Sequence, residues 1–199
     1  MAETSTTLSS PEVEDQAIWG GVTDPTQHDP KHFRYLLHID SGHRLVPFDP
    51  NDPHNDDLWE YALDDPDKLR SLDYISASLV DENHPVLYQF TSSSHGFILE
   101  SPKSSIIAAT SRDMFARSKS KSAEGLRNEF GVPDPEQLLN ETRINEWNEV
   151  VVSPDGMVIK ALFWTDTKAD DEAPFEKEAV KSAAEKLRLP FLELDLVKF

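Results

Sequence analysis

The chain has 199 residues, of which 38% are hydrophobic and 9% aromatic, so it is long enough for one folded domain with its own core. It contains no cysteine, which excludes disulfide bonds, cysteine ligands for zinc and thiol catalysis. The formal net charge is −18, from 37 acidic and 19 basic residues. Such a charge repels nucleic acid and anionic lipid and steers basic partners towards the protein.

The N-terminal segment is acidic and has no hydrophobic stretch, and apolar runs elsewhere are only a few residues long. We therefore expect neither a signal peptide nor a membrane-spanning helix. Together with the absence of cysteine, this predicts a cytoplasmic protein. The acidic residues are concentrated early in the chain, because residues 1–67 hold fifteen acidic and three basic side chains.

The first elements are expected to be a tail and a short helix. Residues 1–9 are predicted to form a disordered acidic tail, and residues 10–199 a single α+β domain. Ser10 can cap a helix that has Pro11 at its first position and ends at residues 20–21, which are both glycine.

The segment 34–39 has two interpretations. A helix that begins near Asp29 is one of them. The other is a strand, because apolar and polar residues alternate. We favour the strand, paired in a hairpin with residues 44–48 through a two-residue turn at 41–42.

The remaining elements follow from turn residues and periodicity. A helix is expected from Asn55 or Asp56 to residue 63, with a second short helix at 65–72. Later helices are predicted at 112–130, 134–141 and 175–188. Strands are expected at 74–80, 86–90, 97–100, 105–110, 147–152, 157–165 and 191–199, with 153–156 as a hairpin turn and the last strand either interior or partner-binding. Because helices and strands mix without βαβ regularity, the fold class is α+β, with a mostly antiparallel mixed sheet and several short helices.

The stretch 28–43 contains four of the seven histidines. In the expected hairpin, Asp40 lies opposite His43, and His38 shares their face by the two-residue period of a strand. Two imidazoles and one carboxylate suit a divalent transition metal such as iron(II), zinc or nickel. The alternative is that all three side chains point into water at an ordinary surface turn.

A second pattern uses two of the same residues. His38-Ile39-Asp40, followed after 54 residues by His95, resembles the HxD…H motif of iron- and 2-oxoglutarate-dependent oxygenases. The resemblance implies iron bound by His38, Asp40 and His95. The chain departs from that family at Ile106, where the family's oxoglutarate-binding arginine usually lies, and in the predicted helices that follow.

Residues 112–122 form a basic island with a net charge of +3. Arg112, Arg117, Lys119 and Lys121 provide its positive charge. This island can bind a phosphorylated or acidic ligand, although a solvated helix face is the simpler interpretation.

No complete catalytic constellation is present, so the sequence favours a binding or regulatory protein over an enzyme. We expect it to act through protein–protein contacts, as an inhibitor or immunity-type protein does. Its partner is predicted to have a basic surface, which the acidic surface of this protein attracts during association. The candidate acidic contacts are Asp49, Asp52, Asp56 and Asp57. The alternative function is a metal-dependent enzyme that uses His38 and Asp40 with His43 or His95.

Overall fold

The computed structural model describes residues 18–19, 23–39, 44–47, 59–62, 66–87, 95–144, 146–166 and 177–198. The predicted tail at residues 1–9 lies outside these ranges.

One large sheet dominates the described part of the chain. Its strands are β1 (Ile18–Trp19), β2 (Arg34–Ile39), β5 (Ile75–Asp81), β7 (His95–Pro102), β8 (Ile106–Thr110), β9 (Glu149–Val152), β10 (Val158–Trp164) and β11 (Phe191–Glu193). They are ordered β11-β10-β7-β2-β5-β9-β8, and β1 pairs with the end of β7. Neighbouring strands are antiparallel except β10 and β11, so the predicted mostly antiparallel mixed sheet is confirmed.

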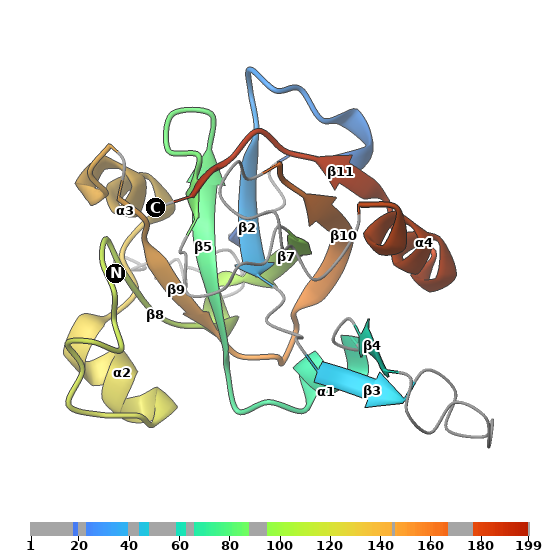
Figure 1. Cartoon of the computed structure of the whole chain (residues 1–199). Coiled ribbons are helices and arrows are strands. Elements are labelled where there is room, and N and C mark those ends of the chain that lie inside the picture. Colours follow the sequence, from blue (N-terminus) through green and yellow to red (C-terminus); the bar gives the residue numbers. More distant parts are fainter. Residues whose placement is uncertain are drawn as a thin grey trace, which may run out of the picture.

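The other elements surround this sheet. Two small sheets pair β3 (Arg44–Pro47) with β4 (Trp59–Ala62), and β6 (Val86–Leu87) with β12 (Val197–Lys198). The helices of the described part are α1 (Pro66–Arg70), α2 (Ala123–Phe130), α3 (Pro135–Glu141) and α4 (Lys177–Leu187), with 3-10 turns η2 (Pro25–Gln27) and η3 (Lys103–Ser105). Figure 1 shows α2 and α3 beside β8 and β9, and α4 at the other end beside β10 and β11. The α+β fold class is therefore confirmed.

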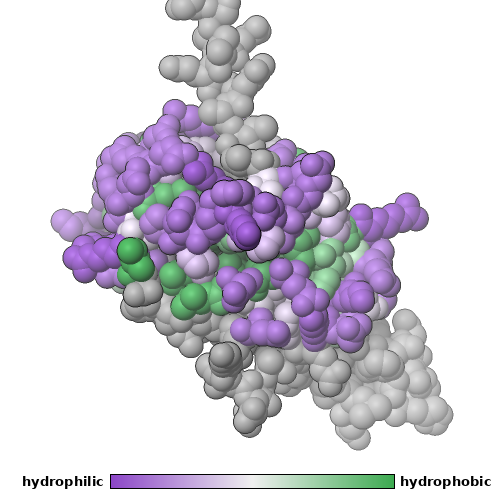
Figure 2. Space-filling view, turned by 90° about the horizontal axis from the view of Figure 1, so that it is seen from above, coloured by the Kyte–Doolittle hydropathy of each residue, from purple (hydrophilic) through white to green (hydrophobic). Residues whose placement is uncertain are grey.

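Side chains on both faces of the sheet are buried. Leu36, Phe97 and Leu99 share one apolar cluster with residues of α1, α3 and α4. Tyr35 and Leu37, which point the other way, belong to a second cluster that the C-terminal segment covers. A third cluster joins α2 to β8 and β9. The face drawn in Figure 2 is mostly hydrophilic, with a narrow apolar band across its middle. No described helix has the length and apolar character needed to cross a bilayer.

Three early predictions are wrong where the structure describes them. Ile18 and Trp19 end the expected first helix, yet they pair with Pro102 and Ser101 as β1. Residues 59–62 of the expected second helix form β4, whose aromatic residues favour a strand once β3 offers backbone partners. The expected hairpin between 34–39 and 44–48 is also wrong, because β2 pairs with β5 and β7 while β3 pairs with β4.

Residues 153–156 do form a turn, but the strands beside it do not pair with each other. Gly156 has a φ of 77°, and the Met157 amide donates to the carbonyl of Pro154 at 3.2 Å. However, β9 pairs with β5 and β8, whereas β10 pairs with β7 and β11. The predicted hairpin is therefore wrong, because turn residues determine the local bend and not the choice of partner strand.

The C-terminal segment is neither interior nor one continuous strand. β11 forms an edge of the sheet, and β12 pairs with β6 elsewhere. Between them Leu194 and Leu196 are buried against the sheet, while Glu193 and Asp195 are exposed. The alternating sequence pattern therefore reflects a segment between β11 and β12 that has one side buried against the sheet and the other exposed to solvent.

Candidate functional site

A cavity of about 220 Å³ lies between the loop that follows β8 and the loop that precedes β9. We call it the arginine recess. Its lining residues are Arg112, Asp113, Arg117, Arg143, Glu146 and Trp147. The recess thus contains two of the four basic residues that the sequence suggested for partner binding, and it adds a third arginine from a distant part of the chain.

The loop that carries Arg112 and Arg117 is not the predicted helix. The helix begins only at Ala123, where Ser122 caps it by accepting a hydrogen bond from the Gly125 amide at 3.2 Å. Upstream, the Ser118 hydroxyl donates to the carbonyl of Ser120 at 2.7 Å and accepts from the Ser120 amide at 3.0 Å. The Arg117 and Ser118 amides both donate to the Met114 carbonyl, which closes one turn, and from Ser118 onward serine side chains take the place of further helical backbone hydrogen bonds. The prediction of a helix from residue 112 is wrong for this reason.

Glu149 fastens this loop to the sheet. One carboxylate oxygen accepts from the Met114 amide at 2.7 Å, and the other accepts from the Ser76 hydroxyl at 2.8 Å. Glu149 is only 3% exposed. Burial raises the pKa of its carboxyl, the hydrogen bonds from Ser76 and Met114 oppose this increase, and the charge of Asp113 adds to it. Glu149 on β9 thus holds the backbone between Arg112 and Arg117, and Ser76 on β5 holds the Glu149 carboxylate.

The recess has more cationic groups than its own carboxylates neutralise. Arg143 is paired with Glu146, with 3.2 Å between Nη1 and Oε1. The Asp113 carboxylate accepts from the Ala116 amide at 2.8 Å. Among the described residues, neither Arg112 nor Arg117 has a carboxylate oxygen within 4.0 Å. Arg112 is half-buried, whereas Arg117 is exposed.

This arrangement can bind an anionic group. Guanidinium groups present paired N–H donors that match a carboxylate or a phosphoryl group. Trp147, which is 8% exposed, provides an apolar wall next to them. A ligand that enters the recess therefore meets charge and hydrogen-bond donors against a partly dry surface.

The two predicted lysines lie on the same loop and do not line the recess. Lys121 donates to the carbonyl of Phe115 at 3.1 Å, and its ammonium lies 5.0 Å from the centre of the Phe115 ring. The Lys119 amide donates to Glu129, while its side chain is exposed. The structure thus brings Arg112 and Arg117 together but assigns Lys121 a contact within the loop.

The predicted histidine site is described only in part. β2 pairs with β7 so that His38 lies opposite Phe97, which places His38 and His95 on the same face of neighbouring strands. His38 Nδ1 lies 2.7 Å from the carbonyl oxygen of Ser76, so Nδ1 is the donor and Nε2 the acceptor in the neutral ring. His95 is 2% exposed and stacks on Trp164, with 6.3 Å between ring centres.

Other predicted contacts fall outside the described residues. These are Asp40 and His43 of the metal hypothesis, and the acidic residues Asp49, Asp52, Asp56 and Asp57. Within the residues that are described, no three His, Asp or Glu side chains are placed to hold a metal ion.

Sequence reasoning missed Arg143, Trp147 and Glu149. Arg143 and Trp147 lie 21 and 25 residues beyond the end of the basic island at Ser122, and no local pattern connects the two segments. Glu149 did leave a sign in the sequence, since it is a carboxylate directly before three valines of a buried strand. A charge in that position needs buried hydrogen-bond donors, which Met114 and Ser76 supply.

Comparisons of this chain with protein-family models, with curated proteins and with solved structures found no match.

Proposed function

We propose that this is a binding protein that acts through protein–protein contacts, and that the arginine recess receives an anionic side chain of its partner. The observation that carries the proposal is Arg112, which is half-buried and lines the recess without a carboxylate partner in the described part of the chain. Solvent and salt screen the attraction between a partly buried cation and an anion less than they screen an exposed pair. The anionic group is a carboxylate or a phosphoryl group, since both fit a guanidinium in the same way.

The partner surface around that group is proposed to be basic. The chain carries a net charge of −18, while residues 111–131 hold five basic and three acidic side chains. A long-range field of this sign attracts a basic surface and repels an acidic one. The recess then selects one anionic group within that basic surface. The acidic residues Asp49, Asp52, Asp56 and Asp57 provide the proposed steering, and a cytoplasmic location fits such a role.

A labelled peptide tests the proposal. Its centre is a phosphoserine flanked on both sides by glycine and two lysines, and the matched peptide has serine at the centre. Fluorescence anisotropy is expected to give an affinity for the phosphopeptide at least about tenfold higher. In the Arg112→Gln variant this preference is expected to disappear, whereas Lys186→Gln on the distant helix α4 preserves it. Equal affinity of the native protein for both peptides contradicts the proposal.

A second candidate function is a metal-dependent enzyme. What supports it is the shared face of His38 and His95, together with a His38 tautomer whose Nε2 is the acceptor. Asp40, with or without His43, completes the proposed ligand set. A thermal melt with EDTA and with iron(II), zinc, manganese or nickel tests it. A metal-specific rise of several degrees that is lost in His38→Ala supports the enzyme, and a flat response in every metal contradicts it.

A further inference from the structure

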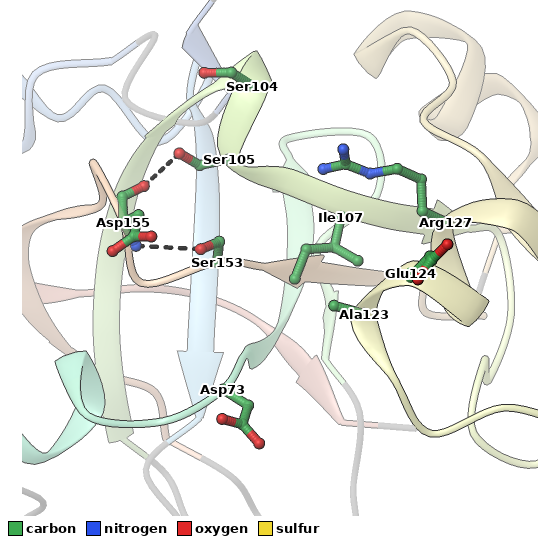
Figure 3. A pocket seen from close by; sticks show the side chains of 9 residues that line it. All are labelled: Asp73, Ser104, Ser105, Ile107, Ala123, Glu124, Arg127, Ser153 and Asp155. Carbon is green, nitrogen blue, oxygen red and sulfur yellow. Dashed lines mark hydrogen bonds between the residues drawn. The ribbon is translucent and has the colours of Figure 1, made fainter.

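A second cavity, of about 430 Å³, lies between α2 and the turn that follows β9 (Figure 3). We call it the α2 trough. Its charged lining consists of Arg127, Asp73, Glu124 and Asp155, and serine side chains together with Ile107 and Ala123 complete it. The volume is within the range of small-molecule sites, about 300–1,000 Å³. None of its residues belongs to the arginine recess.

One wall of the trough is fixed by hydrogen bonds. The Ser105 hydroxyl donates to the carbonyl of Asp155, and the Ser153 amide donates to the carbonyl of Ser105 at 2.8 Å. Gly156, next to Asp155, has a φ of 77°, and a Cβ there would lie 3.2 Å from the Ser105 hydroxyl. The turn is therefore packed closely against the start of β8, and its shape is set before any ligand binds.

The opposite wall provides the cation. Arg127 belongs to α2, and its Nη2 donates to the carbonyl of Ile106 at 3.4 Å. Figure 3 shows the guanidinium extending from α2 above Ile107 towards Ser105. No carboxylate oxygen of a described residue lies within 4.0 Å of it.

The three carboxylates lie around the same space and also make no ion pair with described residues. Asp155 is on the fixed turn, Glu124 is on α2, and Asp73 precedes β5 at one end of the trough in Figure 3. All four charged residues are exposed to solvent, and charges of both signs thus border one cavity without forming ion pairs among the described residues. A single small ligand that carries both signs can satisfy them together, and the excess of carboxylates favours an excess of positive charge on that ligand.

We propose that the α2 trough binds a small zwitterion with more than one cationic group, of the dibasic amino acid class. The ligand's carboxylate pairs with Arg127, and its ammonium groups pair with Asp155 and Asp73. The serine hydroxyls accept the remaining N–H groups.

Amide NMR titrations of the full chain at constant ionic strength test this site. The probes are L-lysine and pentane-1,5-diamine, which is lysine without its carboxylate. L-lysine is expected to shift the amides of Arg127 and Gly156 saturably below about 20 mM, with an affinity at least about tenfold higher than that of the diamine. No saturable shift with L-lysine, or equal affinities for the two probes, overturns the proposal.

Variants locate the binding. Arg127→Gln is expected to remove the preference for L-lysine over the diamine, and Arg127→Lys to restore part of it. Asp155→Asn keeps the backbone carbonyl that Ser105 contacts, and it is expected to lower the affinity for both probes. Glu185→Gln, an exposed position on α4, is the matched control and leaves both affinities unchanged. An unchanged preference in Arg127→Gln overturns the assignment, whatever the arginine recess binds.

Discussion

His38 and His95 lie within the central strands β2 and β7, whereas Arg112, Arg117 and Arg143 lie on loops at the β8–β9 end of the sheet. Both groups contain side chains that commonly bind ligands. The histidines, however, already contact their own protein, through the Ser76 carbonyl and the Trp164 ring. In the recess, three guanidinium groups face two carboxylates, and each of those carboxylates already has a partner of its own. The difference shows that ligand-binding potential depends on what remains unsatisfied after folding.

The same comparison distinguishes residues that stabilise the fold from residues that bind a ligand. Glu149 is as deeply buried as His95, yet its contacts reach directly into the loop that carries the arginines. Changes at the buried residues should therefore lower stability, and changes at the arginines should lower affinity. Separate effects of this kind test the account more strongly than either effect alone.

The largest expected effect is that of Glu149→Ala. The substitution leaves the buried Met114 amide and the Ser76 hydroxyl without their acceptor, so we expect the free energy of unfolding to fall by about 3–5 kcal/mol. Urea denaturation measures it. Glu149→Gln retains one carbonyl oxygen as an acceptor, so its free energy of unfolding should fall by less. A loss of under about 1 kcal/mol in Glu149→Ala would show that the carboxylate does not anchor the loop.

His95→Ala sharpens the other half of the comparison. Removing a ring that is stacked on Trp164 and 2% exposed leaves a cavity, and we expect a loss of about 2–4 kcal/mol in unfolding free energy. The affinity of the recess for O-phospho-L-serine should not change. A stable His95→Ala protein that instead loses metal-dependent stabilisation would favour the enzyme hypothesis.

Arg112→Gln should have the opposite profile. The loss of one charged hydrogen-bonding partner weakens phosphoserine binding by about 1.5–3 kcal/mol, which is tenfold or more in affinity. The free energy of unfolding should change by less than about 0.5 kcal/mol, because no carboxylate of the described chain pairs with this arginine. Calorimetric titration and urea denaturation of the same samples separate the two quantities. Lys186→Gln provides the charge-matched control.

The smallest expected effect is on pH dependence. Burial raises the pKa of Glu149 above its ordinary value of 4.5, so the folded state binds this proton at a higher pH than the unfolded state does. The stability of the native protein relative to Glu149→Gln should therefore fall as pH rises from about 4.5 through the raised pKa, and should recover on acidification. Urea denaturation of both proteins across this range measures the difference. If the difference in unfolding free energy between the two proteins is constant with pH or grows with pH, the pKa of Glu149 is not raised in the folded state.

The positions of many helices and strands were predictable from the sequence, whereas the pairing between strands was not. Strands are expected at 34–39, 74–80, 97–100 and 105–110, close to β2, β5, β7 and β8, and α3 follows from Asp134 and Pro135 at its start. The separation of β9 from β10 was not predictable, because their turn carries no information about distant partners. For the same reason the sequence suggested Arg112 and Arg117 but missed Arg143, whose loop approaches theirs only when β9 pairs with β8.

The most direct measurement is a titration of the full chain with O-phospho-L-serine at constant ionic strength, following the arginine Nε–H resonances by NMR. We predict saturable shifts for Arg112 and Arg117, no shift for Arg188, and loss of saturation in Arg112→Gln. Uniform shifts of all exposed arginines, with the same dependence on O-phospho-L-serine concentration in Arg112→Gln, would contradict the proposed role of the recess.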